Sequence, residues 1–240
     1  MKWETTGATP QVAILFSLPD EAKPFLKSAS ANRAKVAICG VGAARAEATT
    51  RELLTDGFPT NGILIVCGFA GGLSSYLGAG DLILAERVLD PTAPHKTYIA
   101  DSSLRARGES LRVSGVAYRT GVLATGSRVL ITKQEKGAFF EETQADAVDM
   151  ETVGAIRVAE ERGVRWLAVR ALSDDAETDL PLDFNTLTGA NGFPALGRIV
   201  LQTLLHPTKI PALIGLGKRS ALAAHNLSRF LEAFLKEQSQ

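Results

Sequence analysis

The stretch AVDMETVGAIRVAEERGVRWLAVRALSDD, residues 147–175, predicts a short strand, a helix and a second strand in succession. Apolar residues recur at helical spacing between positions 153 and 159, and Gly163 follows where a helix commonly ends. The run Val164–Leu172 is almost uniformly apolar, as parallel strands covered on both faces are. The stretch therefore predicts an α/β fold.

Each strand of this stretch ends on an acidic residue, Glu151 after the first and Asp174 after the second. Because the carboxyl ends of parallel strands line the ligand crevice of an open sheet, we expect both side chains to face that crevice. Glu21 follows another predicted strand, residues 12–16, and lies in the first turn of a helix that begins near Pro19. It is either a third acid of the crevice or a charge that compensates the helix dipole.

The composition restricts the class of protein. A chain of 240 residues with 45% hydrophobic residues is long enough for one α/β domain with a sizeable core. Lys plus Arg equals Asp plus Glu, at 26 each, so there is no electrostatic case for nucleic acid. Cys39 and Cys67 lie in apolar runs, and the N-terminus lacks the apolar core of a signal peptide. We therefore expect a cytoplasmic protein with free thiols.

Two glycine-rich segments follow predicted strands. Residues 40–42 precede a helix from about Ala43 to Asp56, and such a turn can cradle an anion on its backbone N–H groups. Arg45, in the first turn of that helix, is a candidate phosphate or carboxylate ligand, or simply a solvated cation. Residues 68–72 follow the predicted strand 62–67 and imply close backbone approach to a ligand or a helix. Neither segment has the GxGxxG pattern of a dinucleotide site.

The remaining predictions concern two loops and a C-terminal helix. Residues 90–110 and 177–192 are polar and without clear period, so both are predicted to be loops, the second a candidate lid. A last helix from Pro211 to Leu235, perturbed near Gly215 and Gly217, has apolar residues at helical spacing. It packs on the domain or a second subunit, or lies as an interfacial helix on a membrane.

The chain contains the motifs GFAGGL, GAGDL, VDMETVGAI and RALSDD, in that order. Over roughly residues 11–178 it therefore resembles the purine nucleoside phosphorylase and methylthioadenosine/S-adenosylhomocysteine nucleosidase superfamily. The resemblance implies a three-layer α/β/α sandwich with a mixed central sheet. It also implies one domain over residues 1–240, with a core of about 11–205 and a C-terminal helical extension of about 206–240. The activity implied is cleavage of a purine N-glycosidic bond.

The C-terminal run HPTKIPALIGLGKRSALAAHNLSRFLEAFL is similar to the C-terminus of the hopanoid-associated phosphorylase branch. This implies phosphorolysis of a hopanoid-linked adenosine lipid, with adenine leaving. The alternatives are hydrolysis of methylthioadenosine or S-adenosylhomocysteine, and non-catalytic nucleoside binding. The superfamily resemblance also implies a homo-oligomer, and the tail leaves peripheral membrane contact open.

The resemblance assigns roles to five residues. Glu151 matches the family glutamate that binds the ribose 2′- and 3′-hydroxyls, and Met150 matches the methionine under the sugar. Asp174 matches the aspartate that protonates the purine at N7, and Ser173 is its neighbour in the motif. Glu21 aligns with the glutamate that activates water in the nucleosidases.

Further matches concern the base and the nucleophile. Ala70 and Gly71 match a loop near both, and Phe69 stands where the nucleosidases usually carry a small hydroxyl residue. Val129 and Leu130 stand where the family stacks an aromatic residue on the purine, so an aliphatic base pocket is expected. To donate a proton, Asp174 must be protonated, which an apolar and water-poor site beside these residues would favour.

Two residues are the candidate phosphate ligands. The arginine-bearing phosphate loop of the hexameric phosphorylases is not recognisable, and Gly42 and Arg45 are the residues that replace it. Carboxylates alone supply the acid, the base and the ribose ligand, so no metal and no organic cofactor is expected. Phosphate stays open as a co-substrate.

Overall fold

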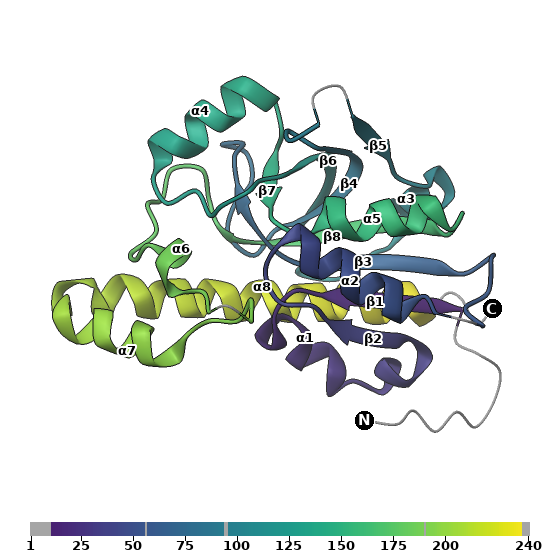
Figure 1. Ribbon diagram of the computed structural model, residues 1–240, viewed down its shortest axis with the longest axis horizontal. Coiled ribbons are helices and arrows are strands. Elements are labelled where there is room, and N and C mark those ends of the chain that lie inside the picture. Colours follow the sequence, from purple (N-terminus) through teal and green to yellow (C-terminus); the bar gives the residue numbers. More distant parts are fainter. Residues whose placement is uncertain (1–10, 56, 94–95, 190, 237–240) are drawn as a thin grey trace.

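The computed structural model describes residues 11–55, 57–93, 96–189 and 191–236. Helices and strands alternate along most of the chain (Figure 1). The strands are β1 (Val12–Phe16), β2 (Lys35–Ile38), β3 (Ile63–Gly72), β4 (Leu82–Leu89), β5 (Thr97–Ile99), β6 (Tyr118–Thr125), β7 (Ala147–Asp149) and β8 (Arg165–Asp174). The α-helices are α1 (Pro19–Leu26), α2 (Ala43–Leu53), α3 (Ser102–Ser110), α4 (Lys133–Thr143), α5 (Thr152–Glu161), α6 (Phe184–Leu187), α7 (Leu196–Leu205) and α8 (Ile210–Lys236).

These strands form one mixed sheet. β1 pairs in parallel with β2 and β3, and β3 pairs in parallel with β8. β8 in turn pairs antiparallel with β4, which runs parallel to β6, and β6 runs parallel to β7. Because β7 pairs back onto the end of β3, five strands close into a ring. The mixed central sheet expected from the sequence is confirmed.

Helices cover the sheet on two sides, and the alternation of side chains along β3 shows how. Leu64 and Val66 point into a core that includes α2 and α5. Ile65 and Cys67 point into a second core that includes α1 and α8. A strand buried on both faces must be apolar throughout, which explains the uniform composition of this run.

The structure corrects three local predictions, one of which is the predicted loop at residues 177–192, because this segment contains α6. The glycine-rich segment 68–72 is not a loop but the second half of β3, because its backbone pairs with β8 as far as Asp174 and with β7. Residues 90–110 are not one loop, because they contain β5 and α3. Asp101 caps α3 by accepting hydrogen bonds from the N–H groups of Ser103 and Leu104.

The last helix differs from its prediction in continuity. α8 runs unbroken through Gly215 and Gly217, and most side chains of its second half, from Ala223 to Leu235, are buried. This half packs against α1 and β8 and belongs to the core, while the first half projects to the left in Figure 1 together with α7. No helix among the described residues is long and apolar enough to cross a membrane.

The crossing of α5 on α2 depends on a glycine. A Cβ at Gly154 would lie 1.9 Å from the carbonyl oxygen of Ala43. We expect Gly154→Ala to push the helices apart and to lower the free energy of unfolding by about 1–3 kcal/mol, the usual cost of overpacking. Denaturant unfolding measures this.

The matched control is Gly137→Ala on α4, where a Cβ would meet nothing within 4 Å. Here we expect a gain of up to about 1 kcal/mol, from better helix propensity alone. Equal changes in the two variants would contradict the packing argument.

Candidate active site

The second half of β3 brings the three predicted acids together. Glu21 lies on α1, directly after β1, and both its carboxylate oxygens lie next to Gly68, where a Cβ would be 2.9 Å from Oε2. Asp174 ends β8, and its Oδ2 atom would lie 3.5 Å from a Cβ at Gly71. Glu151 follows β7, the strand that pairs with Gly71 through Val148. Gly68 and Gly71 are three residues apart, roughly 10 Å along a strand.

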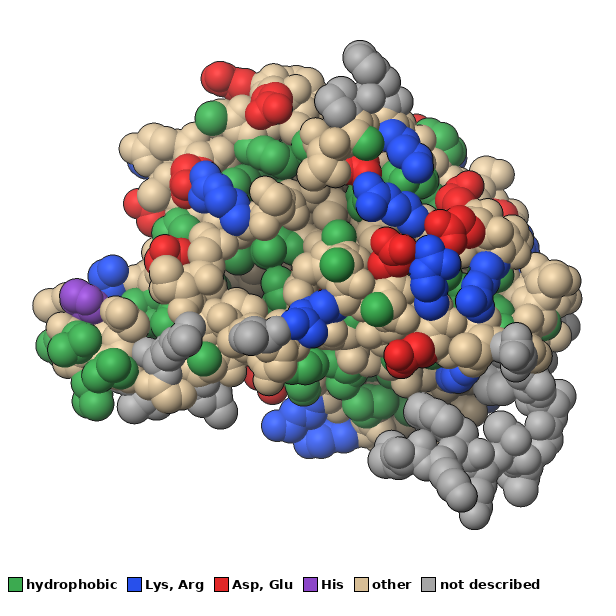
Figure 2. Space-filling view, viewed as in Figure 1, with side chains coloured by type: hydrophobic (Ala, Val, Ile, Leu, Met, Phe, Trp, Pro, Cys, Tyr) green, Lys and Arg blue, Asp and Glu red, His purple; other side chains and the backbone are tan. Residues whose placement is uncertain are grey.

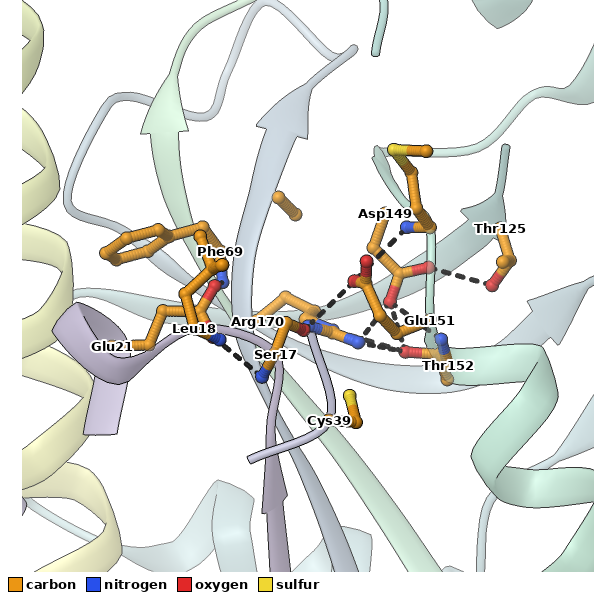
Figure 3. Close-up of polar contacts among 12 residues, drawn as sticks. Ser17, Leu18, Glu21, Cys39, Phe69, Thr125, Asp149, Glu151, Thr152 and Arg170 are labelled. Atoms are coloured by element: carbon orange, nitrogen blue, oxygen red, sulfur yellow. Dashed lines mark hydrogen bonds and ion pairs between the residues drawn. The ribbon is translucent and has the colours of Figure 1, made fainter. Parts of the chain in front are cut away.

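A buried arginine occupies the centre of this crevice (Figure 3). Arg170 on β8 is fully buried, and its guanidinium forms an ion pair with Asp149. It also donates a 2.8 Å hydrogen bond to Thr152 Oγ1 and lies 3.7 Å from a carboxylate oxygen of Glu151. A buried cation is tolerated only with such partners, so Arg170 ties β8 to the start of α5.

Glu151 is held from two sides. Its Oε1 atom accepts a 3.0 Å hydrogen bond from the backbone N–H of Gly42, and its Oε2 atom faces Arg170. Gly42 has a φ of 110°, a conformation that glycine adopts readily, and this aims its N–H group at the carboxylate. Burial raises the pKa of Glu151, although the charge of Arg170 opposes the shift.

Glu21 satisfies both interpretations made from the sequence. Its Oε2 atom accepts hydrogen bonds from the N–H groups of Ser17 and Leu18, at 2.9 and 2.8 Å, and so caps the start of α1. Its Oε1 atom accepts a 2.9 Å hydrogen bond from the N–H of Phe69 on β3. Burial outweighs these bonds and raises the pKa of Glu21 to about 7. A carboxyl group with such a pKa can exchange a proton near neutral pH.

The surroundings of Asp174 differ from the sequence-based expectation. Instead of an apolar site, the structure shows a salt bridge of 2.5 Å between Asp174 Oδ2 and Nζ of Lys136, both side chains being buried. Nζ also donates hydrogen bonds to the carbonyl oxygens of Asp175 and Thr178, at 2.6 and 2.8 Å. The other carboxylate oxygen of Asp174 accepts a 2.7 Å hydrogen bond from Ser173 Oγ. Asp174 is therefore a hydrogen-bond acceptor on both oxygens.

In the part of the chain that the structure describes, the predicted base-pocket residues form no hydrogen bond with the three acids, although Val148, which packs with Leu130, lies beside Gly71 as Asp174 does. Leu130 is buried in a small core with Val148, below α4, and Val129 is bonded to Asn185 through its backbone. Their contribution to a base pocket stays a prediction. Ala70 is buried on β3, where its carbonyl oxygen lies 3.4 Å from Ser173 Oγ.

The predicted phosphate ligands are engaged elsewhere. The N–H of Gly42 is used by Glu151, as described above. The side chain of Arg45 lies so close to Gly192 that a Cβ there would be 2.6 Å from its Nε atom. These contacts give no support to an anion site between the two residues.

A cavity of about 170 Å³ opens beside the crevice and is lined in part by Met150, Gly42 and Thr125. Glu21, Glu151 and Asp174 are not among its lining residues. Within the described part of the chain, no group of three or more His, Cys, Asp or Glu side chains is placed to hold a metal ion.

Two cations of the site, Arg170 and Lys136, were not predicted from the sequence. The sequence does contain an indication for Arg170, because an arginine in the middle of an apolar strand that is covered on both faces is expected to be buried and paired. The burial of Lys136 could not be predicted, because the apolar residues of α4 do not recur at helical spacing and its lysines resemble solvated ones.

Comparisons with known proteins agree with this fold. The sequence model of the Phosphorylase superfamily matches residues 20–204, and the chain belongs to that superfamily. It is 30% identical over 166 residues to a methylthioadenosine/S-adenosylhomocysteine nucleosidase of Geobacillus kaustophilus, covering 60% of this chain and 68% of the relative. The corresponding nucleosidase of a Marinomonas species is 28% identical over 165 residues, covering 60% and 69%.

Among solved structures, the nucleosidase of Helicobacter pylori with butyl-thio-DADMe-Immucillin-A superposes with a TM-score of 0.71 at 18% identity. The match covers 94% of this chain and 97% of that one. This likeness supports the fold, and membership of the Phosphorylase superfamily makes the chain an enzyme of the nucleosidase or phosphorylase type.

The raised pKa of Glu21 predicts a pH-dependent stability. The group is neutral in both states below its ordinary pKa of 4.5, and the folded protein keeps the proton up to about 7. As pH rises through this window, the unfolded chain loses the proton first, so the free energy of unfolding falls by about 3 kcal/mol. Chemical unfolding across the window measures the slope.

Glu21→Gln removes this contribution, so its stability should fall less steeply with pH than that of the wild type. Asp20→Asn, an exposed neighbour on α1, is the control and should retain the full slope. Parallel curves for the wild type and Glu21→Gln would contradict the assignment.

Proposed function

We propose that the chain hydrolyses the N-glycosidic bond of an adenine nucleoside with a 5′-thioether group, as in methylthioadenosine or S-adenosylhomocysteine. The observation that carries the proposal is the convergence of Glu21, Glu151 and Asp174 on one segment of β3. The names of the curated relatives support the same substrates.

The three acids divide the work of the proposed reaction. Glu151, fixed by Gly42 and facing Arg170, accepts hydrogen bonds from the ribose hydroxyls and orients the sugar. Glu21, with a pKa of about 7, takes a proton from the attacking water. The water oxygen then bonds to the anomeric carbon as the bond from that carbon to the base breaks.

The leaving base needs a proton at N7, and Asp174 delivers it. Because Asp174 accepts hydrogen bonds on both oxygens, the proton must first reach it. The ammonium of Lys136, 2.5 Å away, is the nearest source. The proton passes from Lys136 to Asp174 and from Asp174 to N7, and the proton that Glu21 took from the attacking water returns through solvent to the amine of Lys136.

The contacts of Gly42 and Arg45 favour water over phosphate as the nucleophile. The backbone N–H of Gly42 is bonded to Glu151 and is not available to phosphate, and the Nε atom of Arg45 lies beside Gly192. The second candidate is a hopanoid-linked or other lipid-linked adenosine, cleaved with phosphate. The exposed apolar side chains of α7 and α8 are the observation that favours it.

The test is release of adenine from methylthioadenosine, with and without phosphate. We expect equal rates in the two conditions, and a kcat lowered roughly 10²- to 10⁴-fold in Asp174→Asn and in Glu21→Gln, the range for loss of one acid–base group. Asp20→Asn, which changes an exposed carboxylate next to Glu21, should retain full activity.

Other results would change the proposed nucleophile, the substrate or the role of Asp174. Release that requires phosphate would replace hydrolysis by phosphorolysis, and release confined to an adenosine with an apolar lipid at the 5′ position would establish the second candidate. Undiminished release in Asp174→Asn would remove that residue from the reaction.

A further inference from the structure

The helices α7 and α8 form a hairpin that projects from the body of the protein, at the left in Figure 1. The end of this hairpin, residues 201–214, is called the apolar tip here. Large hydrophobic side chains are exposed on it, namely Leu201, Leu204, Leu205, Ile210 and Ile214. Leu204 and Leu205 are the most exposed of them, at 73% and 62%. Figure 2 shows hydrophobic side chains gathered at the left end of the molecule, where a histidine is also exposed.

The exposed residues on α7 share one face of the helix. Leu201, Leu204 and Leu205 are spaced by three and four positions, which places them on neighbouring turns of the same side. Ile210 and Ile214 repeat this spacing at the start of α8. Each of the two helices of the tip therefore exposes several apolar residues on one side, and not scattered single residues.

The segment around the tip contains basic residues but no acidic ones. No Asp or Glu occurs among residues 184–231, whereas the whole chain contains equal numbers of acidic and basic residues. Lys209 and Lys218 are exposed in or next to the tip. An apolar surface flanked only by cations is typical of a helix that lies on an anionic lipid surface.

A second copy of the chain is the other occupant to consider. In a two-fold interface the same patch meets itself, so Lys209 and its neighbours would face lysines of the partner with no acid in the segment to pair with. Like charges across an interface are unfavourable, and this argues for a partner of opposite charge.

We infer that the apolar tip is a membrane-contact site, which inserts its leucines at the surface of an anionic bilayer while Lys209 and Lys218 contact the lipid phosphates. Shallow insertion fits the position of Lys209, which lies between Leu205 and Ile210 and keeps its charge at the level of the headgroups. Membrane binding needs no turnover, so this inference stands or falls independently of the proposed reaction.

The test is sedimentation of the full-length protein with vesicles. We expect binding to vesicles of phosphatidylcholine mixed with phosphatidylglycerol, and much weaker binding to phosphatidylcholine alone or at high salt. The double variant Leu204→Ser with Leu205→Ser should bind roughly tenfold less, because two inserted side chains are lost. Both positions are exposed, so the variant should keep its unfolding temperature.

Ile99→Ser is the matched control, since Ile99 on β5 is 64% exposed and lies away from the tip in Figure 1. Its binding should equal that of the wild type. A wild-type protein that stays in the supernatant with both vesicles would overturn the inference, as would a tip variant that binds fully. If the tip variant instead dissociates an oligomer while vesicles bind no form, the occupant is a second copy.

Discussion

The burial of one guanidinium group, that of Arg170, is the constraint on which the crevice depends. A cation taken out of water is costly unless anions and hydrogen-bond acceptors surround it. Here those partners come from separate elements, Asp149 from β7 and Thr152 from α5, with Glu151 between them. The fold must hold these elements together to keep the charge satisfied. The requirement also explains Gly68, where a Cβ would lie 2.4 Å from the guanidinium.

Buried charged side chains with specific partners are found at both ends of the crevice. At one end Arg170 faces Glu151, and burial keeps the pKa of Glu21 near 7. At the other end Lys136 binds Asp174 and also the backbone that follows β8. A base that accepts protons near neutral pH and an acid with a neighbouring ammonium are suited to opposite proton transfers. This division is the physical basis of the proposed reaction.

The sequence predicted the local elements well and the long-range contacts only in part. The helix predicted from about Ala43 to Asp56 is observed as α2, which runs from Ala43 to Leu53. The extension of β3 through residues 68–72 was missed, because its partners β7 and β8 lie far away in the chain. The roles of the acids were predicted from the order of the sequence motifs. In contrast, the residues around Lys136 do not predict that its side chain is buried.

The most direct test of the central role of Arg170 is a double-mutant cycle on unfolding free energy, with Arg170→Met and Asp149→Asn. Each single change leaves a buried charge without its partner, and we expect a loss of about 3–5 kcal/mol. The double variant removes both charges, so its loss should be smaller than the sum by about 1–3 kcal/mol. A double variant that folds where a single one does not supports the same conclusion. Additive losses would contradict it, and Arg170 would then be an ordinary packed side chain.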